Sequence, residues 1–109
     1  QLQLIIRKDS LAVGDTKNGL IRKFDNVNGE YDFESLVGLL QQIKARIPEK
    51  TEITLLLAEN IDYQTLVTAM DKTRSYPAVV AASVVDAELF PDISIGDAPE
   101  LFSGAEGDS

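Results

Sequence analysis

The chain has 109 residues, of which 44% are hydrophobic and 26% are charged, and its net charge is −8 at pH 7. This length and composition predict a single globular domain with one hydrophobic core, and they exclude a disordered or fibrous chain. The acidic charge excludes a role in nucleic-acid binding, because phosphate recognition needs clustered Lys and Arg side chains. An anionic bilayer surface would repel the same charge.

The sequence contains no cysteine and no histidine. Disulfides and thiolate chemistry are therefore excluded, and the most common general base and transition-metal ligand of proteins are absent. A serine nucleophile would have to rely on Lys, Asp or Glu as its base, and no glycine-rich phosphate-binding motif occurs. We therefore expect no enzymatic activity and no bound cofactor.

Acidic residues lie close together at two turns of the sequence. Glu59 and Asp62 flank a strand-to-helix turn, where an aspartate is the expected N-cap, so we interpret Asp62 as a cap and not as half of a catalytic pair. Residues 25–30 superficially resemble a calcium-binding loop, but Val27 and Gly29 occupy positions that need oxygen ligands. This segment is predicted to be a polar turn without a metal.

Apolar residues alternate with a period of two at the start of the chain. Leu2, Leu4 and Ile6 predict a strand with one face on the core. A turn over residues 8–10 leads to a second short strand over residues 11–13. The two segments together predict the first strands of a sheet.

Glycine and asparagine residues are closely spaced between residues 14 and 31, which is typical of turns. We predict a loop over residues 14–31, with a short strand over residues 20–24 and a tight turn at Asn28 and Gly29.

Helical spacing begins after Asp32, which predicts a helix over residues 33–47 with Asp32 as its N-cap. Pro48 ends this helix, because the residue before a proline is disfavoured in the α conformation. The residues predicted to form its buried stripe are Phe33, Leu36, Val37, Leu40, Ile43 and Ile47.

An almost wholly apolar segment over residues 53–58 predicts a central strand, covered on both faces or packed in a dimer. A second helix is expected to begin after Asp62, with Lys72 and Arg74 near its negative end. Its predicted buried stripe consists of Tyr63, Leu66, Val67 and Met70.

The longest segment without a charge, residues 75–85, is too short for the ~20 apolar residues of a membrane-spanning helix. The residues from Pro77 to Val85 are compatible with two structures: a strand, or a continuation of the preceding helix after a kink at Pro77. Ile93 and Ile95 alternate with polar neighbours after Pro91, which predicts an edge strand. The domain is expected to span residues 1–96, followed by an acidic, flexible tail over residues 97–109.

One stretch resembles a protein family. Residues 53–71, ITLLLAENIDYQTLVTAMD, consist of an apolar strand, a short polar turn, a tyrosine that opens a helix, and a terminal Met-Asp. This order is similar to the central signature of the periplasmic domains of ExbD/TolR proteins. The matching motif residues are Tyr63, Leu66, Met70 and Asp71. Residues 14–31 and an insertion over residues 75–88 depart from the family pattern, which leaves ExbD or TolR as the subfamily open.

The resemblance implies an α+β fold with two helices packed on one face of a small mixed β-sheet, and a homodimer. It also implies a single-pass protein of the bacterial inner membrane with this domain in the periplasm. Its partners would be an ExbB/TolQ-type membrane subunit and a periplasmic protein of TonB or TolA type. The implied function is the coupling of the proton motive force to transport across the cell envelope.

In such proteins the proton-carrying carboxylate lies on an N-terminal transmembrane helix. Because the chain starts at Gln1 inside an apolar alternation, we expect such a helix to precede it. A cleavable signal peptide there would instead indicate a stand-alone periplasmic binding or cell-wall interaction module without energy coupling.

Partner binding is expected at exposed strand edges, where an added strand pairs with free backbone groups. The candidate edges are Leu2, Leu4 and Ile6 in the first strand and Ile93 and Ile95 in the last. The same edges are equally suited to pairing with a second protomer.

Overall fold

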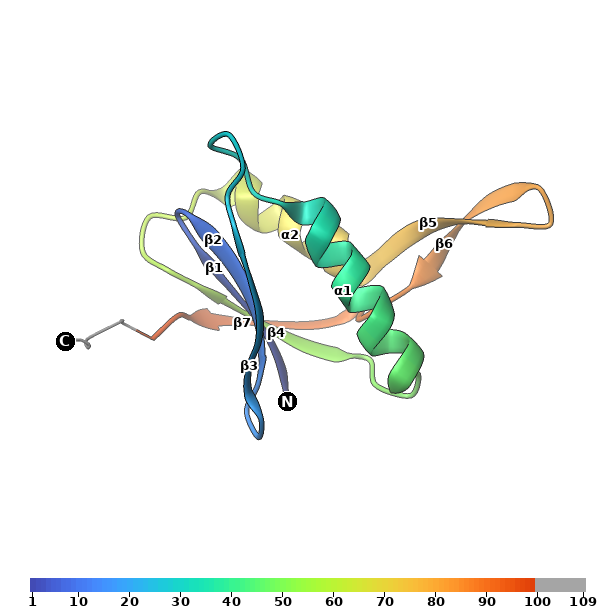
Figure 1. Ribbon diagram of the computed structural model, residues 1–109, viewed down its shortest axis with the longest axis horizontal. Helices are drawn as coiled ribbons and strands as arrows, with labels where there is room; N and C mark the ends of the chain where they lie inside the picture. The colour runs from blue at the N-terminus through green and yellow to red at the C-terminus, as the bar shows by residue number, and fades with distance from the viewer. Residues whose placement is uncertain (100–109) are drawn as a thin grey trace.

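The structure, a computed structural model, describes residues 1–99. This part of the chain forms two helices and seven strands, arranged as Figure 1 shows. In order they are β1 (Leu2–Arg7), β2 (Ser10–Asp15), β3 (Gly19–Asp25), α1 (Phe33–Arg46), β4 (Glu52–Leu57), α2 (Tyr63–Arg74), β5 (Ser75–Val80), β6 (Ser83–Glu88) and β7 (Asp92–Asp97).

The main sheet has five strands in the order β3-β2-β1-β4-β7. β1 pairs with β2 antiparallel and with β4 parallel, and β7 runs parallel to β4, so the sheet is mixed. Both helices lie on one side of it (Figure 1). The predicted class, a small α+β domain with two helices and a mixed sheet, is confirmed.

The hydrophobic core fills the space between the helices and one face of the sheet. Alternate residues of β1 and β4 point into it, as the period of two predicts. The helices contribute three completely buried side chains to this core, those of Leu36 and Leu40 from α1 and of Ala69 from α2. The core residues of the strands are Leu2, Leu4, Ile6, Leu11, Val13, Ile53 and Leu55.

Both helices begin at the predicted aspartate. The Asp32 carboxylate accepts a hydrogen bond of 3.1 Å from the Ser35 backbone N–H, and Asp62 accepts one of 2.8 Å from the Thr65 backbone N–H. These bonds satisfy donors that lack an intrahelical partner in the first turn. The capping role predicted for Asp62 is therefore confirmed.

Acid should destabilise the domain through these caps. The hydrogen bonds to Ser35 and Thr65 lower the pKa of Asp32 and of Asp62. A carboxyl group whose pKa is lower in the folded than in the unfolded protein stabilises the fold when it is ionised. This stabilisation is fully present above the unfolded pKa of about 3.9, and it is lost as the pH falls through the pKa of the folded state. The melting temperature of Asp62→Asn should therefore lie a few degrees below that of the wild type at pH 7, and the two should converge as the pH falls below the lowered, folded-state pKa of Asp62.

Glu59→Gln is the matched control for this measurement, because the Glu59 carboxylate lies at the same turn and accepts no hydrogen bond from residues 1–99. Thermal unfolding followed by circular dichroism between pH 2.5 and pH 7 would detect the convergence. A difference between Asp62→Asn and the wild type that stays constant over this range would contradict the charge-dependent role of the cap.

The buried stripe of α2 differs from the predicted one. Ala69 and Thr73 are its buried residues, and Leu66 and Met70 pack beside them against the core. Tyr63 is 79% exposed, so its predicted place in the stripe is wrong. Tyr63 is the first residue of the helix, and the buried stripe starts one turn later.

The segment predicted as a loop over residues 14–31 contains a complete strand. β3 covers residues 19–25 and pairs with β2, with a register shift between Val13 and Gly14. Its sequence has no apolar alternation, and most of its side chains are exposed. Phe24 packs against the core, and backbone pairing with β2 holds the rest of the strand in the sheet. The predicted turn is confirmed, since Asn28 and Gly29 both have positive φ between the bridged residues Val27 and Glu30.

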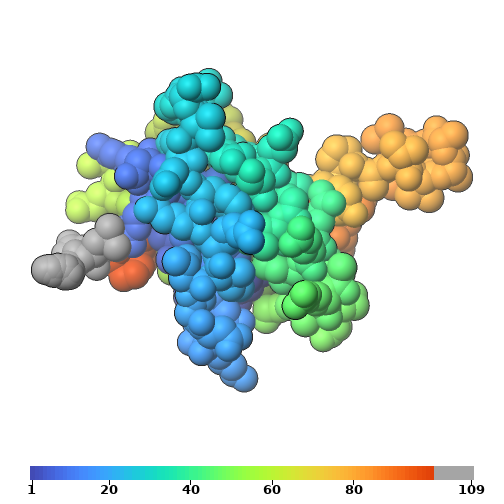
Figure 2. All heavy atoms as spheres, in the orientation of Figure 1, coloured from blue at the N-terminus to red at the C-terminus, as the bar shows by residue number. Residues whose placement is uncertain are grey.

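The insertion over residues 75–88 is a β-hairpin. β5 and β6 pair antiparallel as a separate two-stranded sheet, which decides between the two predicted alternatives in favour of strands. The hairpin extends away from the rest of the domain (Figures 1 and 2).

The last described residues still belong to the packed domain. β7 continues to Asp97, the Ala98 N–H donates to the Leu57 carbonyl (2.8 Å), and the Arg7 guanidinium donates to the Pro99 carbonyl (2.9 Å). The remainder of the predicted tail, residues 100–109, lies outside the described residues. Neither α1 nor α2 is long and apolar enough to cross a membrane.

Candidate functional site

The first strand is not an edge of the sheet. β1 is its third strand and pairs along its length with both β2 and β4. Leu2, Leu4 and Ile6 are at most 2% exposed, in the core under the helices. Their prediction as edge residues is therefore corrected, because two neighbouring strands already use the backbone groups of β1.

The last strand is an edge, as predicted. Within residues 1–99, β7 pairs only with β4. The Asp92 N–H donates to the Thr51 carbonyl (3.0 Å), and the Ala98 N–H donates to the Leu57 carbonyl (2.8 Å). Since backbone groups alternate in direction along a parallel pair, the even-numbered residues of β7 bond to β4. The N–H and C=O groups of Ile93 and Ile95 therefore point away from the sheet.

The side chains of this edge are suited to a strand-shaped partner. Between Asp92 and Asp97 the edge carries no charge, and Ile95 is 51% exposed while Ile93 packs against the core. Both isoleucines lie on the helix side of the sheet, opposite Ile53 and Leu55 of β4. A strand added beside β7 would thus gain apolar contact together with hydrogen bonds.

The opposite edge, β3, is less suited to strand addition. Its central residues include Arg22 and Lys23, and the Lys23 ammonium lies 3.5 Å from the Asp25 carboxylate. Charged residues on an edge strand oppose pairing with another chain, because pairing would bring them out of water. β7 is therefore the better partner edge of the main sheet.

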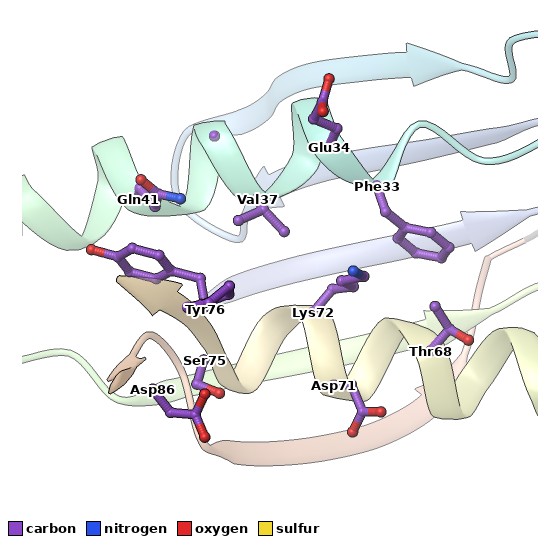
Figure 3. Close-up of a pocket in the computed structure, with 12 residues that line it drawn as sticks. Phe33, Glu34, Val37, Gln41, Thr68, Asp71, Lys72, Ser75, Tyr76 and Asp86 are labelled. Carbon is purple, nitrogen blue, oxygen red and sulfur yellow. The ribbon is translucent and has the colours of Figure 1, made fainter. Parts of the chain in front are cut away.

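A groove of about 580 Å³ lies between α1, α2 and the base of the hairpin (Figure 3). Phe33 and Val37 from α1 point toward α2, and the Tyr76 ring from β5 lies at one end. Lys72 is the cation among its lining residues, which also include Asp71 and Asp86. Within the described residues no group of three His, Cys, Asp or Glu side chains is arranged to hold a metal ion.

A second hollow, of about 760 Å³, lies at the carboxyl ends of the parallel strands β1, β4 and β7. Arg7, Glu59, Asn60 and Asp97 line it, and Asn60 adopts a positive φ of 64° in the turn before α2. The predictions did not include Arg7 or Asp97, because the three strands that bring them together are distant in sequence. The Arg7 guanidinium is already engaged with the Pro99 carbonyl.

The four motif residues do not form one site. Tyr63 is exposed at the start of α2, whereas Leu66 and Met70 pack against the core. Asp71 is exposed and lies 3.7 Å from the Arg74 guanidinium, on the wall of the groove. Leu66 and Met70 therefore have a packing role in the helix, and the four motif residues do not together form a binding site.

Comparison of the chain with models of protein families, with curated proteins and with solved structures finds no match. Three features of the chain itself bear on its function: the fold, the open edge of β7 and the strand-turn-helix order of residues 53–71.

Proposed function

We propose that this chain is the periplasmic domain of an ExbD/TolR-type subunit of the bacterial inner membrane. The observation that carries the proposal is the central unit of the fold, in which β4, a polar turn and α2 follow the family order with Tyr63 opening the helix. Two helices beside a mixed sheet are the architecture that the resemblance implies.

The proposed role is transmission of force and not catalysis. A proton crossing the inner membrane releases ~2.3 kcal/mol per 100 mV. In this family the proton-carrying carboxylate belongs to a transmembrane helix and works with an ExbB/TolQ-type subunit. The domain described here would couple that motion to a TonB- or TolA-type protein and so to transport across the envelope, with no cofactor.

The open edge of β7 is the proposed docking site for the periplasmic partner. Strand addition needs only outward backbone groups and tolerant side chains, and Ile93 and Ile95 supply both. A second protomer of a homodimer would compete for the same edge, because both partners would use the same N–H and C=O groups.

Substitution of Ile95 by proline tests this site. Proline removes the outward N–H of residue 95 but breaks no hydrogen bond to β4. Ile95→Ala is the matched control, because it removes the same side chain and keeps the N–H. We expect Ile95→Pro to weaken binding of a synthetic peptide from a TonB- or TolA-type protein of the same bacterium about tenfold relative to Ile95→Ala.

Isothermal titration calorimetry would measure the two affinities, and amide chemical shifts would show whether Ile93 and Ile95 respond. Equal affinities of the two variants would reject backbone pairing at β7. Binding of isolated peptidoglycan without any binding of the peptide would instead support a stand-alone cell-wall module.

Energy coupling is tested with the full-length protein. If the proposal is right, it copurifies with an ExbB/TolQ-type subunit from the membrane, and replacement of the acidic residue of its transmembrane helix stops energised transport while this domain stays folded. A full-length protein whose domain follows a cleaved signal peptide would overturn the proposal.

A further inference from the structure

The hairpin formed by β5 and β6, here called the arm, is the feature that the proposed function leaves unexplained. Its strands are joined by a two-residue turn at Ala81 and Ala82, with φ of 51° and 67°. The arm stands clear of the domain body in the space-filling view (Figure 2), and the domain is elongated, with extents of 52 × 31 × 21 Å.

The exposed surface of the arm is apolar. Val79 is 75% exposed, Val84 is 73% exposed, and Val80 and Val85 are exposed as well. No charge occurs between Ser75 and Val85. Turns of this type in water usually use Asn, Asp or Gly, because alanine is strained at positive φ. A lone two-stranded hairpin is also only marginally stable in water, so the arm gains stability if another strand joins it.

Only one edge of the arm can accept that strand. The two-residue turn makes Val80 and Ser83 a hydrogen-bonded pair. Hydrogen-bonded and non-hydrogen-bonded pairs then alternate along the hairpin. The bond from the Leu89 N–H to the Arg74 carbonyl (2.9 Å) agrees with this alternation. Pro77 is consequently a non-hydrogen-bonded position whose nitrogen faces outward. Without an N–H it blocks the outer edge of β5.

The outer edge of β6 has no such block. By the same alternation, Val84 and Asp86 direct their N–H and C=O groups away from β5. Within the described residues β6 pairs with no other strand than β5. The arm therefore has a single pairing edge, centred on a valine.

We propose that β6 pairs antiparallel with β6 of a second copy of this chain, so that two arms form a four-stranded sheet. A two-fold axis at Val84 places each Asp86 opposite Ala82 of the other copy. An axis at Asp86 would set the two carboxylates directly opposite each other, which is destabilising. The position of Asp86 thus places the axis in the uncharged part of β6, and the register that we propose is the one centred on Val84.

The net charge of the chain opposes contact between the bodies of two copies and makes the uncharged tip of the arm the place where two copies can meet with the least repulsion. Two bodies with a net charge of −8 repel one another at short range. With the axis at Val84, the base of each arm at Glu88 lies about 13 Å from the axis and the two bases about 26 Å apart, which exceeds the screening length of about 8 Å at physiological salt. A bilayer does not suit the arm, because lipid would leave the outer backbone groups of β6 without hydrogen bonds.

Cysteine cross-linking tests the pairing, and the natural absence of cysteine makes it free of background. In the proposed register the Cα atoms of residue 84 in the two copies lie about 5.5 Å apart, which permits a disulfide. Val79 is the matched control, since it pairs with Val84 across the hairpin and is equally exposed. Its Cα atoms would lie three strand spacings apart, about 14 Å, which is too far.

The purified protein with Val84→Cys should form a disulfide-linked dimer under mild oxidation, and the protein with Val79→Cys should stay monomeric on a non-reducing gel. Cross-linking of both variants to the same extent, or of neither, would overturn the proposed pairing. Because only this chain is present in the sample, a dimer reports self-association and no other partner.

Val84→Pro provides a second measurement without an oxidant. It removes an outward N–H and leaves the hydrogen bonds between β5 and β6 intact, so it should shift the mass measured by sedimentation equilibrium toward the monomer. Peptide binding at Ile95 should not change, because β7 is not part of the arm. Loss of peptide binding with an unchanged mass would contradict the inference, whereas loss of peptide binding in Ile95→Pro alone bears only on the proposed function.

Discussion

Replacing Leu55 with alanine is expected to lower the free energy of unfolding by about 2–5 kcal/mol. Leu55 lies in the middle of β4 between Leu4 of β1 and Ile95 of β7, and its side chain is completely buried under the helices. The loss combines the transfer free energy of the removed methyl groups with the cost of the cavity that remains. Urea denaturation followed by circular dichroism would measure it.

Leu56→Ala is the matched control. Leu56 is the next residue of the same strand, points to the opposite face and is only half-buried. Its truncation should cost less than about 2 kcal/mol, because less apolar area returns to water and no closed cavity forms. Equal losses of unfolding free energy in the two variants would mean that Leu56 is as well packed as Leu55, so that the core would not lie on the helix side of the sheet alone.

Replacing Phe90 with alanine is expected to lower the free energy of unfolding by about 3–5 kcal/mol. Phe90 is completely buried at the point where the chain returns from the arm to β7, and its backbone N–H donates to the Thr73 carbonyl (2.9 Å). The Lys44 ammonium lies 5.2 Å from the centre of its ring. Phe90 therefore connects both helices to the edge strand.

Lys44→Gln separates the cation–π contact from the packing of Phe90. This variant should lose only about 1–2 kcal/mol, because it removes the charge and the hydrogen bond from the Lys44 ammonium to the Lys50 carbonyl and leaves the ring in place. A loss for Phe90→Ala as small as that for Lys44→Gln would show that the ring is not part of the core. Chemical denaturation of both variants at the same pH would make the comparison.

Several elements could be predicted because their signals are local. Asp32 and Asp62 cap the helices as expected, since capping depends on residues within one turn. The apolar segment of β4 became a central strand, and the alternation around Ile93 and Ile95 became an edge strand. The turn at Asn28 and Gly29 needed only the tolerance of these residues for positive φ.

The candidate site could be predicted only in part. β1 and β7 look alike in sequence, as short apolar alternations, yet β1 is central and β7 is an edge. Whether a strand is an edge depends on which distant segments pair beside it, and β4 separates the two strands here. Val84 also could not be recognised as part of a pairing edge, because the blocking position of Pro77 follows from the hairpin register.

The sequence by itself determined the composition of the domain, the positions of its helices, the apolar faces of β1 and β4, and the absence of cysteine and histidine chemistry. These properties depend on residue types and on periods of a few residues. Only the tertiary structure decided that β3 is a full strand, that residues 75–88 form a projecting arm, and that β7 is the open edge near Ile95. Strand pairing is non-local, so the free backbone groups can be identified only after every neighbour is in place.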